Sequence, residues 1–275
     1  MKINVINSLL VMLLISITFS NCGKGDDDPP IVEAKTPTSI NLSNDIIYEK
    51  LPSGTVIGEL STDLTVTGIK YKIVSGEGDT DNSDFVIVGN LLKTLSIFEY
   101  AEGNSKTVRV EATNKTKTYE QALIVNLNEF TGTYPSISSP SFNDNELMPT
   151  NFGADNGNVS PDLDIMDVPA NTVSMVLTMV DIDFFNSFHW LVWNIPPDKT
   201  TIGQNESWPS GTVVGDNDLG TGYIGPFPPS VHRYVITVYF LSEDIDLSPS
   251  NFAQIPNKVA GKILAQISIT GKYEP

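Results

Sequence analysis

The sequence predicts an all-β protein built from two successive β-sandwiches. Short runs that alternate apolar and polar residues, separated by turn residues, occupy residues 38–129, and no segment of helical period interrupts them. Longer, almost continuous apolar runs follow in the C-terminal half. Alternation is typical of strands with one buried face, and continuous apolar runs are typical of strands buried on both faces. The length of 275 residues agrees with two domains.

The N-terminal stretch MKINVINSLLVMLLISITFSNC has the pattern of a secretory signal. A lysine near its start precedes an apolar run too short to cross a bilayer comfortably, and small residues then lead to Cys22, the only cysteine. The position of Cys22 resembles the lipobox of bacterial lipoproteins. This resemblance implies removal of a lipoprotein signal peptide, residues 1–21, and acylation of Cys22, with palmitate on its thiol. An uncleaved membrane anchor is the alternative.

Residues 22–37 are rich in Gly, Asp and Pro and cannot bury a core, so we predict a flexible acidic tether. The acidic run after Cys22 resembles the surface-export signal of lipoproteins in the Bacteroidetes group. That resemblance implies a cell-envelope protein, anchored to the outer membrane by lipid and exposed on the cell surface. A merely solvated linker is the alternative.

The charge of the chain excludes one class of partner. The net charge is −17, and no basic cluster interleaved with aromatic residues occurs, so nucleic acid would be repelled. An anionic membrane surface would also repel the folded part of the chain. Attachment to a membrane would therefore depend on the acyl chains of the lipid anchor.

Residues 38–130 contain six short strand-like runs: SINL, TVIGEL, IKYKIV, DFVIV, KTVRVEAT and QALIVNL. Runs of this length, spaced by turns, predict an antiparallel, immunoglobulin-like β-sandwich. The order of IIYEKLPSGTVIGEL, IKYKIVSGEGD, DFVIV, LSIFEY and VRVEATN resembles a cadherin repeat. The resemblance implies a spacer or adhesion module in this cadherin-like domain.

Cadherin repeats bind calcium between modules through clustered carboxylates, because Ca²⁺ takes six to eight oxygen ligands. The resemblance places Glu49 at the first ligand position, and Glu99 or Glu102 at the later acidic pair. The aspartates expected further along are missing, and VEATN ends in Asn114. We therefore predict no metal site and keep the three glutamates only as weak calcium candidates. A solvated acidic face is the alternative.

The segment FTGTYPSISSPS, residues 130–141, joins the two halves with turn residues and two prolines. Such composition is typical of a domain boundary. We place the boundary near Tyr134 and a second domain at residues 135–275.

Polar side chains stand at the ends of three apolar runs in the second half. TVSMVLTMV leads into Asp181 and Asp183, FHWLVWN begins with Phe188 and His189, and HRYVITVYFL begins with His232. If these strands are neighbours, two carboxylates and two imidazoles converge at one sheet edge. A carboxylate beside a histidine favours the imidazolium, a donor-rich spot that suits a phosphate or carboxylate. The alternative is hydrogen-bonded core histidines and aspartates that cap turn amides.

Five segments, in order, resemble the phosphatidylethanolamine-binding protein family, and its bacterial Raf-kinase-inhibitor-like branch most of all: NVSPDLDI, VPANTVSMVLTMVDID, FHWLVWNIPP, GTGYIGPFPPSVHRYVITVYFL and AGKILAQISITGKYEP. The resemblance implies a Greek-key β-sandwich with a small anion pocket at one end. Phosphate-like and carboxylate groups, including phospholipid headgroups, would bind there. Carried over residue by residue, the ligand-binding residues are Asp181, Asp183, His189, Gly225, Pro226 and His232, with Pro228 and Pro229 completing a wall.

The stretch DIDFF departs from the family pattern. Ile182 and Phe185 replace its two prolines, and Phe184 replaces a small alanine. Without proline the pocket rim loses rigidity, and two phenylalanines could narrow its mouth. Arg233 follows His232 on the strand and is predicted to form a structural ion pair with a buried carboxylate.

We predict a binding protein and no enzyme, because no Gly-x-Ser-x-Gly nucleophile elbow is present and adjacent aspartates cannot bracket a sugar bond. No cofactor is implied. The leading interpretation is a lipid-anchored envelope protein that binds a small anionic ligand or phospholipid headgroup. The alternative is an adhesion or inhibitor-like module with a protein partner and a vestigial pocket, which a pocket plugged by Phe184 or Phe185 would favour.

Overall fold

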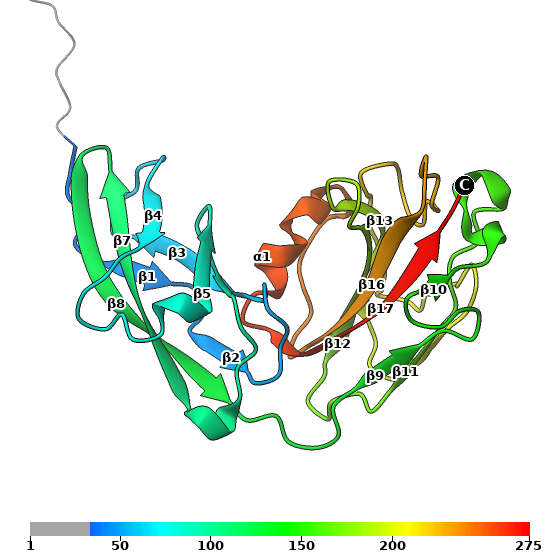
Figure 1. Cartoon of the computed structure of the whole chain (residues 1–275), viewed down its shortest axis with the longest axis horizontal. Helices are drawn as coiled ribbons and strands as arrows, with labels where there is room; N and C mark the ends of the chain where they lie inside the picture. Colours follow the sequence, from blue (N-terminus) through cyan, green and yellow to red (C-terminus); the bar gives the residue numbers. More distant parts are fainter. Residues whose placement is uncertain (1–33) are drawn as a thin grey trace, which may run out of the picture. The chain divides into compact units, whose positions relative to one another are not determined.

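The computed structural model describes residues 34–275, which form one compact unit (Figure 1). The predicted signal peptide, Cys22 and most of the predicted tether lie outside the described residues. Within residues 34–275, no helix is long and apolar enough to cross a membrane.

Residues 40–128 form two four-stranded sheets. One sheet has the order β1 (Ile40–Leu42), β3 (Val56–Thr62), β6 (Leu91–Thr94) and β5 (Phe85–Val88). The other has the order β2 (Ile46–Tyr48), β8 (Lys117–Asn128), β7 (Ser105–Asn114) and β4 (Lys70–Ile73). Short 3₁₀ turns η1 (Asn82–Asp84) and η2 (Tyr100–Glu102) connect strands. On β8 the buried residues are Leu123, Val125 and Leu127, so the alternating pattern places one face in the core.

Residues 136–273 form a six-stranded and a three-stranded sheet. The large sheet has the order β10 (Glu146–Leu147), β17 (Ile263–Tyr273), β16 (His232–Leu241), β12 (Ser174–Asp181), β13 (Ser187–Ile195) and β15 (Val213–Val214). The small sheet has the order β14 (Thr201–Ile202), β11 (Leu163–Met166) and β9 (Ser136–Ser138). The remaining elements are η3 (Thr150–Phe152), η4 (Ala154–Asn156), η5 (Pro249–Gln254) and α1 (Ile255–Val259).

The all-β prediction is confirmed, because α1 is the single α-helix among residues 34–275. The continuous apolar run of β12 is buried on both faces, as predicted, with six successive buried residues. Alternate residues of the large sheet join a core whose buried members include Met175, Leu177, Met179, Trp190, Val192, Ile236 and Val238.

Antiparallel pairing brings the predicted polar residues to one edge of the large sheet. β12 lies between β13 and β16, and Asp181 at its end is in register with Ser187 on β13 and Tyr234 on β16. The chain turns from β12 to β13 within residues 182–186. The end of β12 and the starts of β13 and β16 therefore meet, which is the neighbour relationship that the sequence argument required.

Candidate functional site

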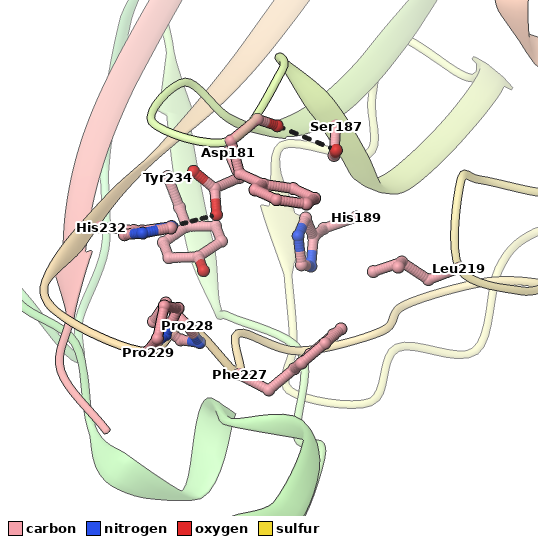
Figure 2. Close-up of a pocket in the computed structure, with 10 residues that line it drawn as sticks. Asp181, Ser187, His189, Leu219, Phe227, Pro228, Pro229, His232 and Tyr234 are labelled. Atoms are coloured by element: carbon pink, nitrogen blue, oxygen red, sulfur yellow. Dashed lines mark hydrogen bonds and ion pairs between the residues drawn. The ribbon is translucent and has the colours of Figure 1, made fainter.

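A pocket of about 100 Å³ lies at this sheet edge (Figure 2). Its size suits a phosphate or a short headgroup, since drug-sized ligands need roughly 300 Å³ or more. Of the six predicted ligand-binding residues, three line it: Asp181, His189 and His232. The other lining residues are Phe184, Ser187, Leu219, Phe227, Pro228, Pro229 and Tyr234.

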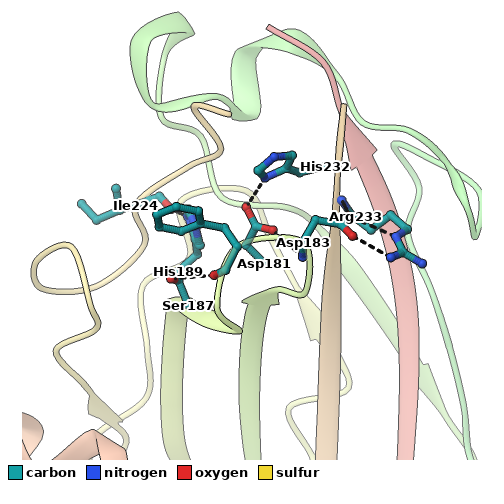
Figure 3. Close-up of polar contacts among 8 residues, drawn as sticks. Asp181, Asp183, Ser187, His189, Ile224, His232 and Arg233 are labelled. Atoms are coloured by element: carbon teal, nitrogen blue, oxygen red, sulfur yellow. Dashed lines mark hydrogen bonds and ion pairs between the residues drawn. The ribbon is translucent and has the colours of Figure 1, made fainter. Parts of the chain in front are cut away.

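Asp181, which is buried, and His232, which is half-buried, form a pair at one side of the pocket. Nδ1 of His232 donates to Oδ2 of Asp181 across 2.8 Å, and Oδ1 of Asp181 accepts the backbone N–H of Asp183 at 2.9 Å (Figure 3). The carboxylate therefore fixes the orientation of the ring and the tautomer with hydrogen on Nδ1. Because Nδ1 is engaged, Nε2 is the nitrogen that His232 can offer to a ligand.

His189 is buried, and its electrostatic state differs from the one the sequence argument assumed. Its Nδ1 lies 2.8 Å from the backbone oxygen of Ile224. A carbonyl only accepts, so Nδ1 carries the proton. Burial lowers the pKa of His189, and the Ile224 carbonyl and Asp181 only partly oppose that effect. At neutral pH the ring is therefore uncharged, and Nε2 is a hydrogen-bond acceptor.

Tyr234 completes the polar part of the pocket. Its ring packs edge-on against His189, with 5.1 Å between the ring centroids. Burial is the main cause that raises the pKa of Tyr234, and a hydrogen bond to Asp181 raises it further. The hydroxyl of Tyr234 therefore stays protonated. Tyr234 follows His232 by two positions on β16, and period-two geometry places both side chains on one side of the strand.

Asp183 does not line the pocket. Its carboxylate pairs with Arg233, at 2.6 Å to one guanidinium nitrogen and 3.0 Å to Nε, and also accepts the Arg233 backbone N–H (Figure 3). Hydrogen bonds from Arg233 lower the pKa of Asp183 to about 2. Arg233 thus forms the predicted ion pair, but with Asp183 at the protein surface. Asp181 and Asp183 diverge because Asp183 already belongs to the turn.

Gly225 and Pro226 support the pocket wall without lining it. The Gly225 N–H donates to Oδ1 of Asn158 at 2.7 Å, and the Pro226 carbonyl accepts from the Ala154 N–H at 2.9 Å. These bonds fix the chain that carries Phe227, Pro228 and Pro229, which do face the pocket. Phe227 occupies the variable position of the Gly-Pro-x-Pro-Pro motif, so the motif itself gave no signal for it.

The two phenylalanines of DIDFF do not plug the pocket. Phe184 lines its mouth and is 52% exposed, and Phe185 is 90% exposed. Leu219 and Phe227, on the side opposite Asp181 in Figure 2, are also exposed. The pocket therefore has a polar floor and an open, apolar mouth.

Glu49, Glu99 and Glu102 form no metal-holding group in the described part of the chain. The buried carboxylate of Glu49 accepts the backbone N–H groups of Tyr100 and Phe130 and lies 3.4 Å from the Lys50 amine. Those hydrogen bonds and Lys50 lower the pKa of Glu49, which is a structural role. Glu99 and Glu102 are exposed. Among residues 34–275, no group of three or more His, Cys, Asp or Glu side chains is arranged to hold a metal ion.

The model of the phosphatidylethanolamine-binding protein family matches residues 138–274. A relative from Methanothermobacter thermautotrophicus named UPF0098 protein is 35% identical over 147 residues, which cover 50% of this chain and 97% of the relative. The chain belongs to the phosphatidylethanolamine-binding protein family. The match confirms the family resemblance of the second half. A Mycobacterium tuberculosis relative, LppC, is named as a lipoprotein and is 28% identical over 50% of this chain and 72% of its own length.

A cadherin domain is among the similar solved structures. The solution structure of the third cadherin domain of human protocadherin 7 covers 35% of this chain and 92% of that domain, with 18% identity and a TM-score of 0.27.

Proposed function

We propose that residues 135–275 bind a small anion bearing a phosphate or carboxylate group, such as a phospholipid headgroup, in the pocket at the end of the large sheet. The observation that carries the proposal is the convergence of the Asp181–His232 pair, His189 and Tyr234 on one pocket of about 100 Å³. Family membership supports the same site.

The protonation states define how such an anion would be held. His232 bonds Asp181 through Nδ1, so Nε2 is the nitrogen that meets an anionic oxygen. His189 is neutral in the empty pocket, so it accepts a P–OH proton or takes up a proton when an anion arrives. A bound anion raises the pKa of His189, which links binding to proton uptake. Affinity should then fall as pH rises above the histidine range.

The net charge of −17 favours ligands that are not purely anionic. Long-range repulsion disfavours free phosphate, whereas the ammonium group of phosphoethanolamine cancels one negative charge of its phosphate and so weakens the repulsion. We therefore expect phosphoethanolamine to bind more tightly than inorganic phosphate at low ionic strength. Adding salt should reduce the difference, because salt screens the long-range repulsion.

We place this function in the cell envelope. The predicted acylation of Cys22 would hold the protein at the outer membrane, residues 22–37 would act as a tether, and residues 38–130 would act as a cadherin-like spacer. A relative named as a lipoprotein supports this arrangement. The open mouth beside Phe184 favours ligand binding over the alternative of an adhesion module with a vestigial pocket. We propose binding without catalysis.

Calorimetric titration of residues 34–275 with phosphoethanolamine tests the proposal. His232→Ala should weaken binding by roughly 1.5–3 kcal/mol, the worth of a charge-assisted hydrogen bond. His189→Asn places an amide nitrogen near the position of Nδ1, which retains the Ile224 contact while it removes Nε2. Ser242→Ala, just beyond the far end of β16, is the matched control.

The pH dependence separates a ligand site from a packing role. Binding should be stronger at pH 6 than at pH 8 in the wild-type protein, and the difference should shrink in His189→Asn. If both histidine variants bind phosphoethanolamine as tightly as Ser242→Ala does, these histidines serve only the core and the proposed pocket function is wrong.

A further inference from the structure

Six exposed apolar side chains lie on the segments that line the pocket, three of them in the pocket lining itself, and together they are named the apolar rim. Each is at least 37% exposed: Ile182, Phe184, Phe185, Leu219, Phe227 and Val231. They come from the β12–β13 turn, the chain after β15 and the chain before β16. Single exposed apolar residues are ordinary, but a contiguous group around a pocket marks an interaction surface.

The backbone presents the most exposed member of the rim at a conformational cost. Phe185 has φ +52° and Asn186 has φ +55°, so two successive residues of the turn are left-handed. That conformation is common for asparagine and unusual for a bulky residue. Phe185 is also 90% exposed and contacts Phe184, with 5.0 Å between ring centroids. Neither packing nor turn chemistry explains an aromatic residue at this position.

The apolar rim is continuous with the pocket. Phe184, Leu219 and Phe227 line the pocket and are exposed as well, while Asp181, His189, His232 and Tyr234 form the polar floor. A ligand that fills the floor with a polar group therefore presents its remaining part to apolar side chains. An amphiphile matches this arrangement. An apolar protein surface would cover the rim and leave the polar floor empty.

The carboxylates near the rim are already engaged. Asp183 pairs with Arg233, Asp218 accepts the Phe188 N–H at 2.7 Å, and Asp216 accepts from the Thr221 hydroxyl at 2.7 Å. The whole chain still carries a net charge of −17, which repels an anionic bilayer. A zwitterionic bilayer carries no net charge, so the negative charge of the chain does not repel it.

We propose that the apolar rim docks on a zwitterionic phospholipid bilayer and inserts Phe184 and Phe185 at the boundary between headgroups and acyl chains. The pocket then receives a headgroup directly from the bilayer. Interfacial binding of this kind scales with the apolar area that is buried. Capture of a headgroup by the pocket rests on the proposed function. Docking of the rim on a bilayer rests only on the exposed side chains and the charge of the chain.

The test uses the protein shortened to residues 34–275, so that no acyl chain on Cys22 can attach it to a membrane. Binding to vesicles of phosphatidylcholine and phosphatidylethanolamine is measured by flotation. Phe185→Ser should weaken vesicle binding about tenfold, because one fully exposed aromatic ring no longer enters the bilayer. Ile124→Ser, at a 57% exposed site on β8, is the matched control and should bind as the wild-type protein does.

Calorimetry with phosphoethanolamine distinguishes failure of the rim from failure of the pocket. Phe185 does not line the pocket, so Phe185→Ser should retain the wild-type affinity for the free headgroup. If Phe185→Ser and Ile124→Ser bind vesicles equally, rim docking is refuted whatever the headgroup titration gives. If vesicles bind through Phe185 but the headgroup titration is flat, the rim proposal stands and the pocket function is lost.

A tryptophan at position 185 measures how deeply the rim enters the bilayer. Phe185→Trp should shift its emission to the blue when vesicles are added and should be quenched by lipids brominated along the acyl chain. Sedimentation measures the alternative occupant, a second copy of the chain. A stable dimer that Phe185→Ser dissolves, together with absent quenching, would assign the rim to self-association and overturn the proposal.

Discussion

Gly225→Ala should destabilise the protein and displace the pocket wall, although Gly225 does not line the pocket. A methyl group on Gly225 would overlap the carbonyl oxygen of Phe152 and lie 2.8 Å from the Ala154 nitrogen, whereas ordinary contacts of a Cβ begin near 3.4 Å. Both neighbours are backbone atoms and cannot rotate away. The segment that carries Phe227 to Pro229 must therefore move outward.

Overpacking of this kind costs roughly 1–3 kcal/mol of the free energy of unfolding. A displaced wall should also weaken phosphoethanolamine binding by about tenfold, since an error of about 1 Å in positioning is costly at a binding site. Gly220→Ala is the matched control, because a methyl group there would meet only the flexible end of Ile224 at 3.6 Å.

Urea unfolding and calorimetry measure the two effects. We expect the unfolding midpoint of Gly225→Ala to fall below that of Gly220→Ala, with an unchanged slope. Equal midpoints and equal affinities for the two variants would refute the argument that Gly225 is required by the close approach of the η3–η4 backbone.

Three further outcomes are expected. Cys22→Ser should release the protein into the soluble fraction of fractionated cells, and unchanged membrane association would contradict lipid anchoring. Residues 134–275 should fold alone with one cooperative urea transition, because no strand of that segment pairs with residues 40–128; a molten product would mean that the first half completes its core. Arg233→Gln should raise the pKa of Asp183 from about 2 toward its ordinary value of 3.8, followed by NMR titration, because the guanidinium hydrogen bonds are lost; an unchanged pKa would assign the shift to other groups. The Asp183 contribution to stability is therefore present above about pH 4 and lost as pH falls toward 2.

The sheet and much of the site were accessible from the sequence. Continuous apolar runs predicted buried strands, and the polar residues at their ends predicted a common edge because antiparallel neighbours reverse direction. Asp181, His189 and His232 meet there. Tyr234 could have been added, since it stands two positions after His232 and shares its side of the strand.

Other parts of the site depended on the chain outside the strands. The direction of Asp183 is set by the β12–β13 turn, in which Phe185 and Asn186 are left-handed. Asn186 favours that conformation, but nothing in DIDFF indicates it for Phe185. The charge state of His189 depends on burial and on the carbonyl of Ile224, a residue of an irregular loop. The alternation of apolar and polar residues along a strand predicts neither the direction of Asp183 nor the charge state of His189. Leu219 reaches the pocket from the same class of loop.

The pairing of β10 with β17 has a consequence for how the protein reaches its active form. Glu146 is in register with Gly271, so this pairing encloses most of the second half of the chain. Contacts of such large sequence separation slow folding, because a long loop must close before the contact stabilises it. The pocket is lined from β12, β13 and β16, which lie within the enclosed chain. If the pocket assembles after the transition state, a bound ligand slows unfolding without accelerating folding.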